Sequence, residues 1–424
     1  MKRIEIRHRV EKQREGTYYA IPFSVPEGIV KLTVSYRYDK ITQGLTGHRK
    51  TANIIDLGLQ DAAGRFLGWS GSAKESVSVG EYSSEKGYFS EPIQPGQWQI
   101  LIGAYKINGL YTDVVYTIEL EERQSRFYFG DLHVHSEASD GKYSAWQLAQ
   151  KAMEAGLDFL ALADHNNYSE NFHLPSISDF TFIPAVEWTH YKGHMNLFGA
   201  RAPFDNGFIA NTAEEMRQLL SRAKELGAYV SVNHPKCSVC PYLWQDDTAF
   251  DWMEIWNGPM RPANRKALAW WTELLSGGRK IPIVAGSDYH KGNFPVQLGH
   301  PLTAVYSDSP AAEALLEALA KGHSYITSGV KGAKLQLSYG EQMMGDTISV
   351  ARSAELLVRA RLPKGQLLQM VTARGVRTLD LQNGRATVTV SKKEKFAYLK
   401  AVLPIGGGNL FTAVSNPIYF ADTP

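Results

Sequence analysis

The sequence is poor in cysteine and has no long apolar segment at its start. Its 424 residues include two cysteines, Cys237 and Cys240, so a disulfide framework is excluded. The first residues, MKRIEIRHRVEKQ, are polar and charged, and neither a signal peptide nor a membrane span is predicted. We therefore expect a cytoplasmic protein, because thiols stay reduced in that compartment.

The chain also lacks a marked excess of charge of either sign. Lys and Arg number 45 and Asp and Glu 43, which gives a net charge of +2, and this balance gives no support to nucleic-acid binding. Hydrophobic residues make up 44% and charged residues 21%, a composition that excludes general disorder and supplies a core. At about 150 residues per domain, the length predicts two or three domains.

The two ends of the chain resemble each other in pattern. Residues 1–122 contain short alternating runs such as IVKLTVSYRY, the period of a half-buried strand, and predict an antiparallel β-sandwich-like domain. Residues 331–424 return to such runs, with Asn383-Gly384 between two of them. Because Asn-Gly between alternating segments is typical of a hairpin, we predict a second sandwich-like domain there.

The middle zone, residues 123–330, alternates apolar runs with helical patterns. We expect helices to begin near Ser144 and Thr212, and others to follow Arg261 and Ser309. Ser144 and Gln147 have the spacing of a capping box. Seven strands are expected, in the segments FYFGDLHVH, FLALADH, FIPAVEW, HMNLFGA, YVSVNH, WMEIWN and PIVAGSD. This number predicts an α/β barrel or a large doubly wound sheet, whose functional sites form at the carboxyl ends of the strands.

Histidines concentrate in this middle zone. Nine of the twelve lie between His133 and His300. His133 and His135 are two apart on one strand, so their side chains share a face and could chelate one ion; Asp288 and His290 repeat this spacing. Further potential ligands stand where apolar runs begin or end: Asp164, His165, Glu187, His194 and His234.

These residues lie in segments that resemble the PHP (polymerase and histidinol phosphatase) metallohydrolases. The resemblance covers about residues 127–330 and includes, in order, GDLHVHSEASDG, ADHNN, PAVEW with GHMNLFG, VNHP and GSDYH. The SDG form of the first motif, GSDYH and the downstream ITSG are most similar to the CehA/McbA-like branch. The resemblance implies a distorted seven-stranded β/α barrel, with β-sandwich-like domains flanking it.

Two or three divalent metal ions (Mn, Fe or Zn) are implied by the same resemblance. By motif position, a first ion would be held by His133, His135, Glu187 and Asp288, and a second by Glu187, His194 and His234. A third would use Asp140, His165 and His290. Asp140 stands where many PHP proteins have a histidine, and the added oxygen favours manganese or iron over zinc.

Clustered divalent ions supply hydroxide from water at neutral pH and stabilise charge on a phosphoryl or carbonyl oxygen. We therefore predict a metal-dependent phosphoesterase acting on a small phosphorylated molecule, with a hydroxide that bridges the ions through Glu187 and Asp288 as nucleophile. Arg261 is the preferred phosphate contact, because its guanidinium can bind two oxygens at once. The other basic candidates follow strand ends: Lys142, Lys192, Lys236 and Lys291.

Other interpretations stay open. The same metal centre could hydrolyse a carbamate, ester or amide, and Trp188, Trp244, Trp252 and Trp256 could line its pocket, although core packing is the favoured role of these tryptophans. A nucleic-acid substrate follows from the family resemblance alone. The chain could instead be an inactive carbohydrate- or protein-binding module. The CxxC segment Cys237-Ser-Val-Cys240 could be a redox pair or half of a zinc site. A structural or incidental pair is favoured, with an oxidation-sensitive metal site as the minor interpretation.

Overall fold

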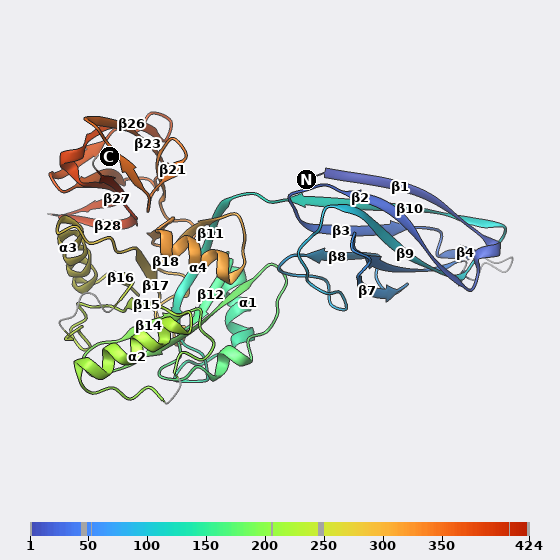
Figure 1. The fold of residues 1–424 in the computed structure, drawn as a ribbon, viewed down its shortest axis with the longest axis horizontal. Coiled ribbons are helices and arrows are strands. Elements are labelled where there is room, and N and C mark those ends of the chain that lie inside the picture. Colours follow the sequence, from blue (N-terminus) through green and yellow to red (C-terminus); the bar gives the residue numbers. More distant parts are fainter. Residues whose placement is uncertain are drawn as a thin grey trace. The chain divides into compact units, whose positions relative to one another are not determined.

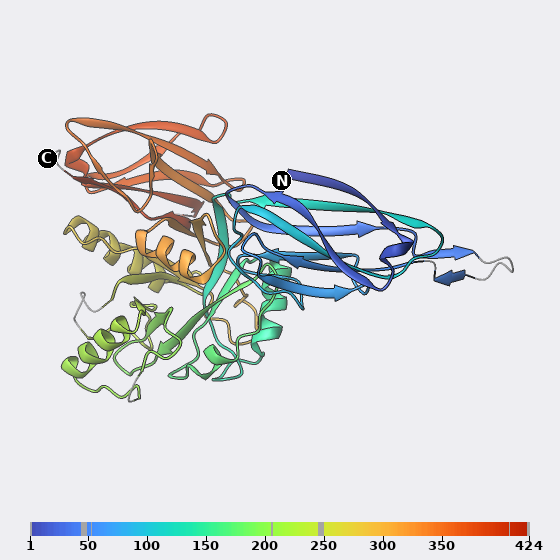
Figure 2. The ribbon, with the colours of Figure 1, turned by 45° about the vertical axis from the view of Figure 1, so that its right-hand side comes forward.

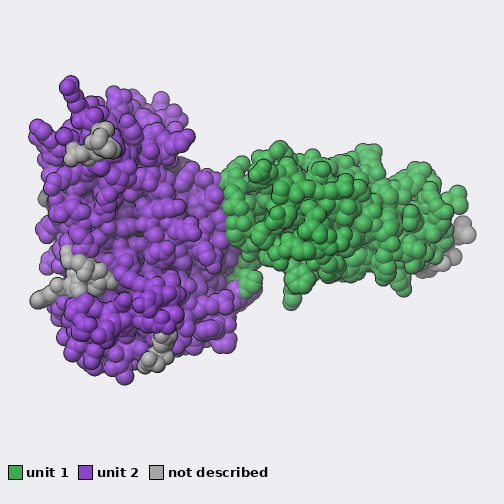
Figure 3. Space-filling model, viewed as in Figure 1, with its two compact units in different colours: residues 1–124, 176–179 green, residues 125–175, 180–424 purple. Residues whose placement is uncertain are grey.

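The computed structural model describes residues 2–43, 49–51, 53–204, 207–244, 250–406 and 408–421. The chain divides into two units, one of residues 1–124 with 176–179 and one of residues 125–175 with 180–424 (Figure 3). Both units are rich in strands, and the four α-helices of the described residues all lie in the second. A separate third domain over residues 331–424 stays a prediction.

The first unit consists of antiparallel strands. One sheet has the order β1 (Lys2–Glu11), β10 (Tyr111–Glu122), β3 (Ile29–Arg37), β8 (Ser76–Gly80), and another the order β2 (Thr17–Val25), β9 (Gly96–Lys106), β6 (Ile54–Gln60), β7 (Phe66–Gly71). Strands β4 (Ile41–Gln43) and β5 (Arg49–Thr51) form a separate pair. Figures 1 and 2 show these strands in blue to cyan.

The core of the first unit explains its sequence pattern. Leu32, Val34 and Tyr36 on β3 are buried, and they belong to the same apolar cluster as Ile100 and Ile102 on β9 of the other sheet. Side chains from both sheets therefore fill one core, as in a sandwich. The period-2 alternation predicted for β3 is confirmed.

The second unit carries the helices that the sequence predicts (Figure 1). They are α1 (Ala145–Ala155), α2 (Ala213–Glu225), α3 (Pro262–Ser276) and α4 (Ala312–Lys321). Ser144 caps α1 in a capping box with Gln147, as predicted, and Thr212 caps α2 in the same way with Glu215. No helix of the described residues is long and apolar enough to cross a membrane.

The strands of residues 126–327 build the sheet that carries most of the histidines. They are β11 (Arg126–Val134), β12 (Phe159–Leu162), β13 (Thr181–Trp188), β14 (Met195–Phe198), β15 (Tyr229–Val232), β16 (Trp252–Asn257), β17 (Ile283–Gly286), β18 (Leu302–Ser307) and β19 (Ser324–Thr327). The seven predicted strands correspond to β11–β17. Strand β14 runs antiparallel to both β13 and β15, whereas the other neighbours within β11–β17 are parallel.

A closed seven-stranded barrel is not shown by the strand pairing of the described residues. The sheet order is β17-β16-β15-β14-β13-β12-β11-β18-β19, and β18 pairs with residues 126–130 of β11. Strand β18 thus occupies about half of the β11 edge with which another strand would have to pair to close a barrel. Beyond β17, Asp288 N donates to His133 O at 2.8 Å and His135 N to Tyr289 O at 3.0 Å, so the two ends of the seven-strand path meet only near the predicted ligands.

The remaining strands extend this sheet and add a smaller one. They are β20 (Lys334–Tyr339), β21 (Gln342–Met343), β22 (Thr347–Ser349), β23 (Ser353–Arg361), β24 (Leu367–Thr372), β25 (Gly375–Leu379), β26 (Arg385–Ser391), β27 (Phe396–Ile405), β28 (Gly408–Ser415) and β29 (Ile418–Ala421). From β19 the large sheet continues through β28, β27, β24 and β25, with β29 pairing β27 and β22, and the smaller sheet has the order β21-β20-β23-β26.

The predicted hairpin at Asn383-Gly384 is a turn, but not a two-stranded hairpin. Both residues have positive φ angles, 52° and 75°, and Gln382 and Arg385 exchange backbone hydrogen bonds of 2.8 and 3.0 Å. Beyond the turn, however, β25 pairs with β24 and β26 pairs with β23. The turn therefore transfers the chain from one sheet to the other.

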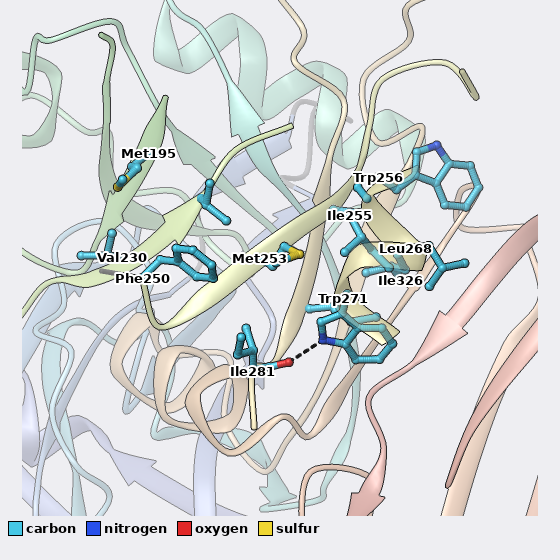
Figure 4. Close-up of a cluster of buried hydrophobic side chains, with 14 of the residues drawn as sticks. Met195, Val230, Phe250, Met253, Ile255, Trp256, Leu268, Trp271, Ile281 and Ile326 are labelled. Carbon is cyan, nitrogen blue, oxygen red and sulfur yellow. Dashed lines mark hydrogen bonds between the residues drawn. The ribbon is translucent and has the colours of Figure 1, made fainter. Parts of the chain in front are cut away.

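An apolar core packs α3 against β16 and its neighbours (Figure 4). Trp271 of α3 is fully buried and its Nε1 donates to Ile281 O at 2.8 Å. The four tryptophans considered for a substrate pocket are also buried, with exposures of 0, 6, 1 and 5% for Trp188, Trp244, Trp252 and Trp256. The predicted core role of these side chains is confirmed.

The close approach of β17 to β11 depends on a glycine. A Cβ atom at Gly286 would lie 2.3 Å from His133 Cβ and 2.7 Å from His133 N. Gly286→Ala is therefore expected to push the two segments apart and to destabilise the fold by about 3 kcal/mol, measured by urea denaturation. Gly277→Ala is the control, because its Cβ would come no closer than 3.4 Å to a neighbour; equal stability of the two variants would contradict this packing argument.

Candidate metal centre

The predicted ligands gather at one edge of the sheet. Parallel strands bring their carboxyl ends to this edge, and antiparallel β14 begins there because Trp188 pairs with Met195. The ligands from carboxyl ends and the loops after them are His133, His135, Asp140, His165, Glu187, His234, Asp288 and His290. His194 directly precedes β14. The direction of β14 thus explains why a residue at the start of a strand joins residues at the ends of the others.

Glu187 lies at the centre of this cluster and is 1% exposed. Its Oε1 lies 3.3 Å from His133 Nε2, 3.2 Å from His194 Nδ1 and 3.5 Å from His234 Nε2. Its Oε2 lies 2.8 Å from His165 Nδ1. Burial raises the pKa of Glu187, but the surrounding imidazoles, His133 foremost, outweigh burial and hold that pKa well below its usual range. Glu187 is therefore an ionised carboxylate facing several imidazoles.

Asp288 provides a second carboxylate on the same imidazoles. Its Oδ1 lies 3.2 Å from His135 Nε2 and 3.6 Å from His133 Nε2. Burial raises the pKa of Asp288, whereas His133 and His135 lower it, and the net effect is a pKa well below the usual range. Asp288 also has a φ of 53°, a left-handed conformation that non-glycine residues rarely adopt and that often marks functional sites.

A third group contains the exposed carboxylate of Asp140. Asp140 Oδ1 lies 3.3 Å from His290 Nε2 and 3.7 Å from His165 Nε2. Together with His135, these residues offer four ligand atoms within 4.8 Å of one another. The structure therefore brings together the three residues that were assigned to a third ion by motif position.

Residues that the sequence analysis did not select support the cluster. Glu254 on β16 is buried, and its Oε1 lies 3.0 Å from His133 Nδ1, while its Oε2 accepts from His234 N at 2.9 Å. Asn233 Nδ2 donates to Glu187 Oε1 at 2.8 Å. The sequence does contain a signal for Glu254, which is a charged residue within the apolar strand WMEIWN. A buried charge needs a specific partner. Such contacts orient the imidazoles.

The ligand atoms converge, but several of them lack a hydrogen-bond partner. His133 Nε2, His135 Nε2 and Glu187 Oε2 are buried and have no hydrogen-bond partner, although ion-pair distances between them and neighbouring ligand atoms are short. Buried polar atoms are normally paired. Imidazole nitrogens and carboxylate oxygens aimed at a common point fit divalent metal ions, which would supply the missing partners.

The basic residues proposed as phosphate contacts are not part of this cluster of short contacts. Arg261 is exposed at the N-cap of α3. The ammonium groups of Lys192 and Lys236 lie 4.8 Å from the Trp244 ring and 4.1 Å from the Trp270 ring. A substrate role for Arg261, and for Lys142, Lys192, Lys236 and Lys291, stays a prediction.

The two cysteines lie beside the cluster. Their Sγ atoms are 3.1 Å apart, and Cys240 Sγ lies 3.5 Å from His234 Nδ1. Both side chains are half-buried and carry free thiols. Cys240 therefore joins His194 and His234 in a further group of ligand atoms within 4.8 Å. A metal site at the CxxC pair was the minor interpretation of the sequence, without these histidines as its partners.

A cavity of about 590 Å³ lies elsewhere, at the amino ends of the strands. Tyr229, Trp252 and Pro282 are among its lining residues, and no predicted ligand lines it. The short contacts between titratable groups, rather than this cavity, therefore identify the candidate site.

A part of the chain that carries several of the predicted ligands matches a known family model. Residues 131–232 match the model of the PHP domain family. The matched range includes His133, His135, His165, Glu187 and His194, whereas His234, Asp288 and His290 follow it. The match to the PHP domain is limited to this segment of the chain. No curated protein sequence matches the chain.

Solved structures give more distant likenesses. A two-domain protein from Bacteroides vulgatus, described as containing a predicted PHP-like metal-dependent phosphoesterase, is 16% identical with a TM-score of 0.38, over 68% of this chain and 95% of its own. A proposed metal-dependent phosphoesterase from Bifidobacterium adolescentis is 16% identical with a TM-score of 0.28, over 40% of this chain and 90% of its own. An amidohydrolase from Chromobacterium violaceum is 14% identical with a TM-score of 0.32, over 39% of this chain and 89% of its own.

Proposed function

We propose that this chain is a metal-dependent hydrolase that cleaves a phosphoester of a small molecule. The observation that carries the proposal is the set of buried, mutually unsatisfied nitrogen and oxygen atoms around Glu187, within and beside the residues that match a PHP domain. We also propose that the chain belongs to the CehA/McbA-like branch. The SDG, GSDYH and ITSG segments support this assignment.

Some of these residues would hold the metal ions, and one of them would also face the water and the substrate. His133, His135, Glu187 and Asp288 would hold a first ion, and Glu187 with His194 and His234 a second. Such ions lower the pKa of water and stabilise negative charge on phosphoryl oxygens. The Glu187 side chain is 1% exposed and organises the imidazoles, whereas that of Asp288 is 30% exposed. Asp288 therefore faces the side from which water and substrate arrive.

The reaction is tested with the purified, metal-reconstituted chain and a panel of aryl phosphates, nucleotides and aryl carbamates. We expect phosphate release that Asp288→Ala reduces at least about 100-fold, and that Asp380→Ala, at an exposed position after β25, leaves unchanged. Turnover of carbamates alone would replace the phosphoester by a carbamate, ester or amide. A metal-free, inert chain that retains a glycan or peptide would support a binding module instead.

The third ion is tested at Asp140, whose side chain is 60% exposed. Asp140→Ala removes one oxygen ligand from a group that includes His165 and His290, without disturbing the buried core. We expect the metal content to fall by about one ion per chain, measured by elemental analysis, while the stability of the fold is unchanged. An unchanged metal content would reduce the proposed centre to two ions.

Arg261 is the proposed phosphate contact. It stands four residues after Asn257, whose Nδ2 lies 3.4 Å from Asp288 Oδ2, so its loop begins at the candidate site. Arg261→Ala is expected to raise KM for a phosphoester about tenfold, because charge-assisted hydrogen bonds to the phosphate are lost. Arg265→Ala, one turn further along α3, is the matched control. A KM that matches that of the unaltered chain would exclude Arg261 from substrate binding.

A further inference from the structure

The loop after His234 holds two thiols whose positions are not explained by the hydrolase chemistry. Cys237 and Cys240 are half-buried, so small reagents can reach them. Their sulfur atoms are already 3.1 Å apart, and a disulfide requires an approach to about 2 Å. This small movement can occur within the loop.

The surroundings of Cys237 favour its thiolate, which is the reactive form of cysteine. The backbone amides of Val239 and Cys240 both donate to Cys237 Sγ at 3.4 Å. Hydrogen bonds to a sulfur atom stabilise negative charge on it. Cys237 is therefore placed to attack, and Cys240 to resolve.

The sulfur of Cys240 is also the outer partner of a candidate metal ligand. His234 Nε2 faces Glu187 Oε1 at 3.5 Å, while His234 Nδ1 faces Cys240 Sγ at 3.5 Å. An imidazole that binds a metal through one nitrogen carries its proton on the other, and that proton needs an acceptor. For His133 the corresponding partner is the Glu254 carboxylate at 3.0 Å; for His234 it is a sulfur atom.

We propose that Cys237 and Cys240 form a reversible dithiol–disulfide pair, oxidised by a small-molecule disulfide, and that the reduced Cys240 sulfur orients His234 for metal binding. The coupling to metal rests on the proposed function, whereas disulfide formation does not. Oxidation draws the Cys240 sulfur toward Cys237, away from the His234 N–H, and leaves it as a disulfide sulfur, a poorer hydrogen-bond acceptor.

The chemistry balances with oxidised glutathione as the oxidant. The Cys237 thiolate attacks one glutathione sulfur, which forms a mixed disulfide and releases one glutathione thiolate. The Cys240 thiolate then attacks the Cys237 sulfur, forms the intramolecular disulfide and releases the second glutathione thiolate. Two electrons pass from the two cysteines to glutathione, and their two protons leave with the two glutathione thiols.

The disulfide is tested by counting thiols. The full chain is equilibrated with mixtures of reduced and oxidised glutathione, quenched, alkylated and weighed by mass spectrometry. We expect a direct change from two free thiols to none, and Cys240→Ser should instead accumulate glutathione on Cys237. Two thiols that persist in oxidised glutathione, or a stable mixed disulfide in the unaltered chain, would overturn the proposal.

The coupling is tested by titrating manganese or zinc into the metal-free chain against a competing chelating dye. We expect the second ion to bind about tenfold more weakly after oxidation, as is usual when an outer partner is lost. Cys240→Ala should show this weaker binding without oxidation, and Cys237→Ser, which keeps the contact of Cys240 with His234, should bind tightly in either buffer. Equal affinities of the reduced and oxidised chain overturn the coupling alone; absence of binding by the reduced chain overturns the coupling together with the proposed function.

Discussion

Glu187→Gln is expected to remove at least one metal ion per chain and to lower turnover about 1000-fold or more. The amide has nearly the shape of the carboxylate, but it has no negative charge and replaces one acceptor oxygen by a donor. Glu187 is the only residue assigned to both of the first two ions, and its oxygens lie within 3.3 Å of His133 Nε2, His194 Nδ1 and His165 Nδ1. The metal content is measured by elemental analysis and turnover by phosphate release.

Two further variants separate loss of ligation from loss of folding. Glu225→Gln removes a carboxylate whose side chain is 62% exposed in the last turn of α2, and should change neither quantity. Glu187→Asp keeps the charge on a shorter side chain and should retain part of the metal. Full metal content and turnover in Glu187→Gln, with the fold verified by circular dichroism, would show that the cluster is not the active centre.

The local elements of the fold could be predicted because local patterns determine them. Ser144 and Gln147 form the predicted capping box, and β3 buries the predicted apolar face. The neighbour of each strand in a sheet could not be predicted in this way, because alternation indicates a strand and its buried face but not the strand that it pairs with. The pairing of β18 with β11 and the separation of β25 from β26 depend on contacts distant in sequence. Local patterns contain no such information. They left an α/β barrel and a doubly wound sheet open, and they indicated a hairpin at Asn383-Gly384.

The candidate site followed from the sequence for a related physical reason. Strand ends converge at one edge of a sheet, so polar residues that end apolar runs can be placed at one edge from their sequence positions. Their assignment to individual ions, and Asp140 altogether, came from the resemblance to PHP proteins. Glu254 and Cys240 were missed as partners of His133 and His234 because they act through contacts across strands and loops. Their sequence positions indicate burial or reactivity, but do not identify the imidazole that each contacts.

The carboxylate of Glu254 contributes to a pH dependence of metal binding. Burial lowers the pKa of His133, but the negative charges of Glu254, Glu187 and Asp288 outweigh burial and raise that pKa well above 6.5. In the folded, metal-free chain, His133 therefore stays in its doubly protonated, cationic form near neutral pH. The stabilisation from the second proton is present at low pH and is lost as the pH rises through the raised pKa. A metal ion that binds His133 must displace the proton, so metal affinity should increase with pH up to that pKa.

We expect this proton to be released on metal binding and the apparent affinity to rise up to about tenfold per pH unit. Calorimetric titrations in two buffers of different ionisation enthalpy measure the number of protons released at neutral pH. Glu254→Gln should reduce that number, because the amide no longer raises the pKa of His133, and should also weaken metal binding about 10- to 100-fold, because the outer partner is altered. Equal heats in the two buffers would contradict a protonated His133. Proton release that Glu254→Gln leaves intact would assign the raised pKa to Glu187 and Asp288 instead.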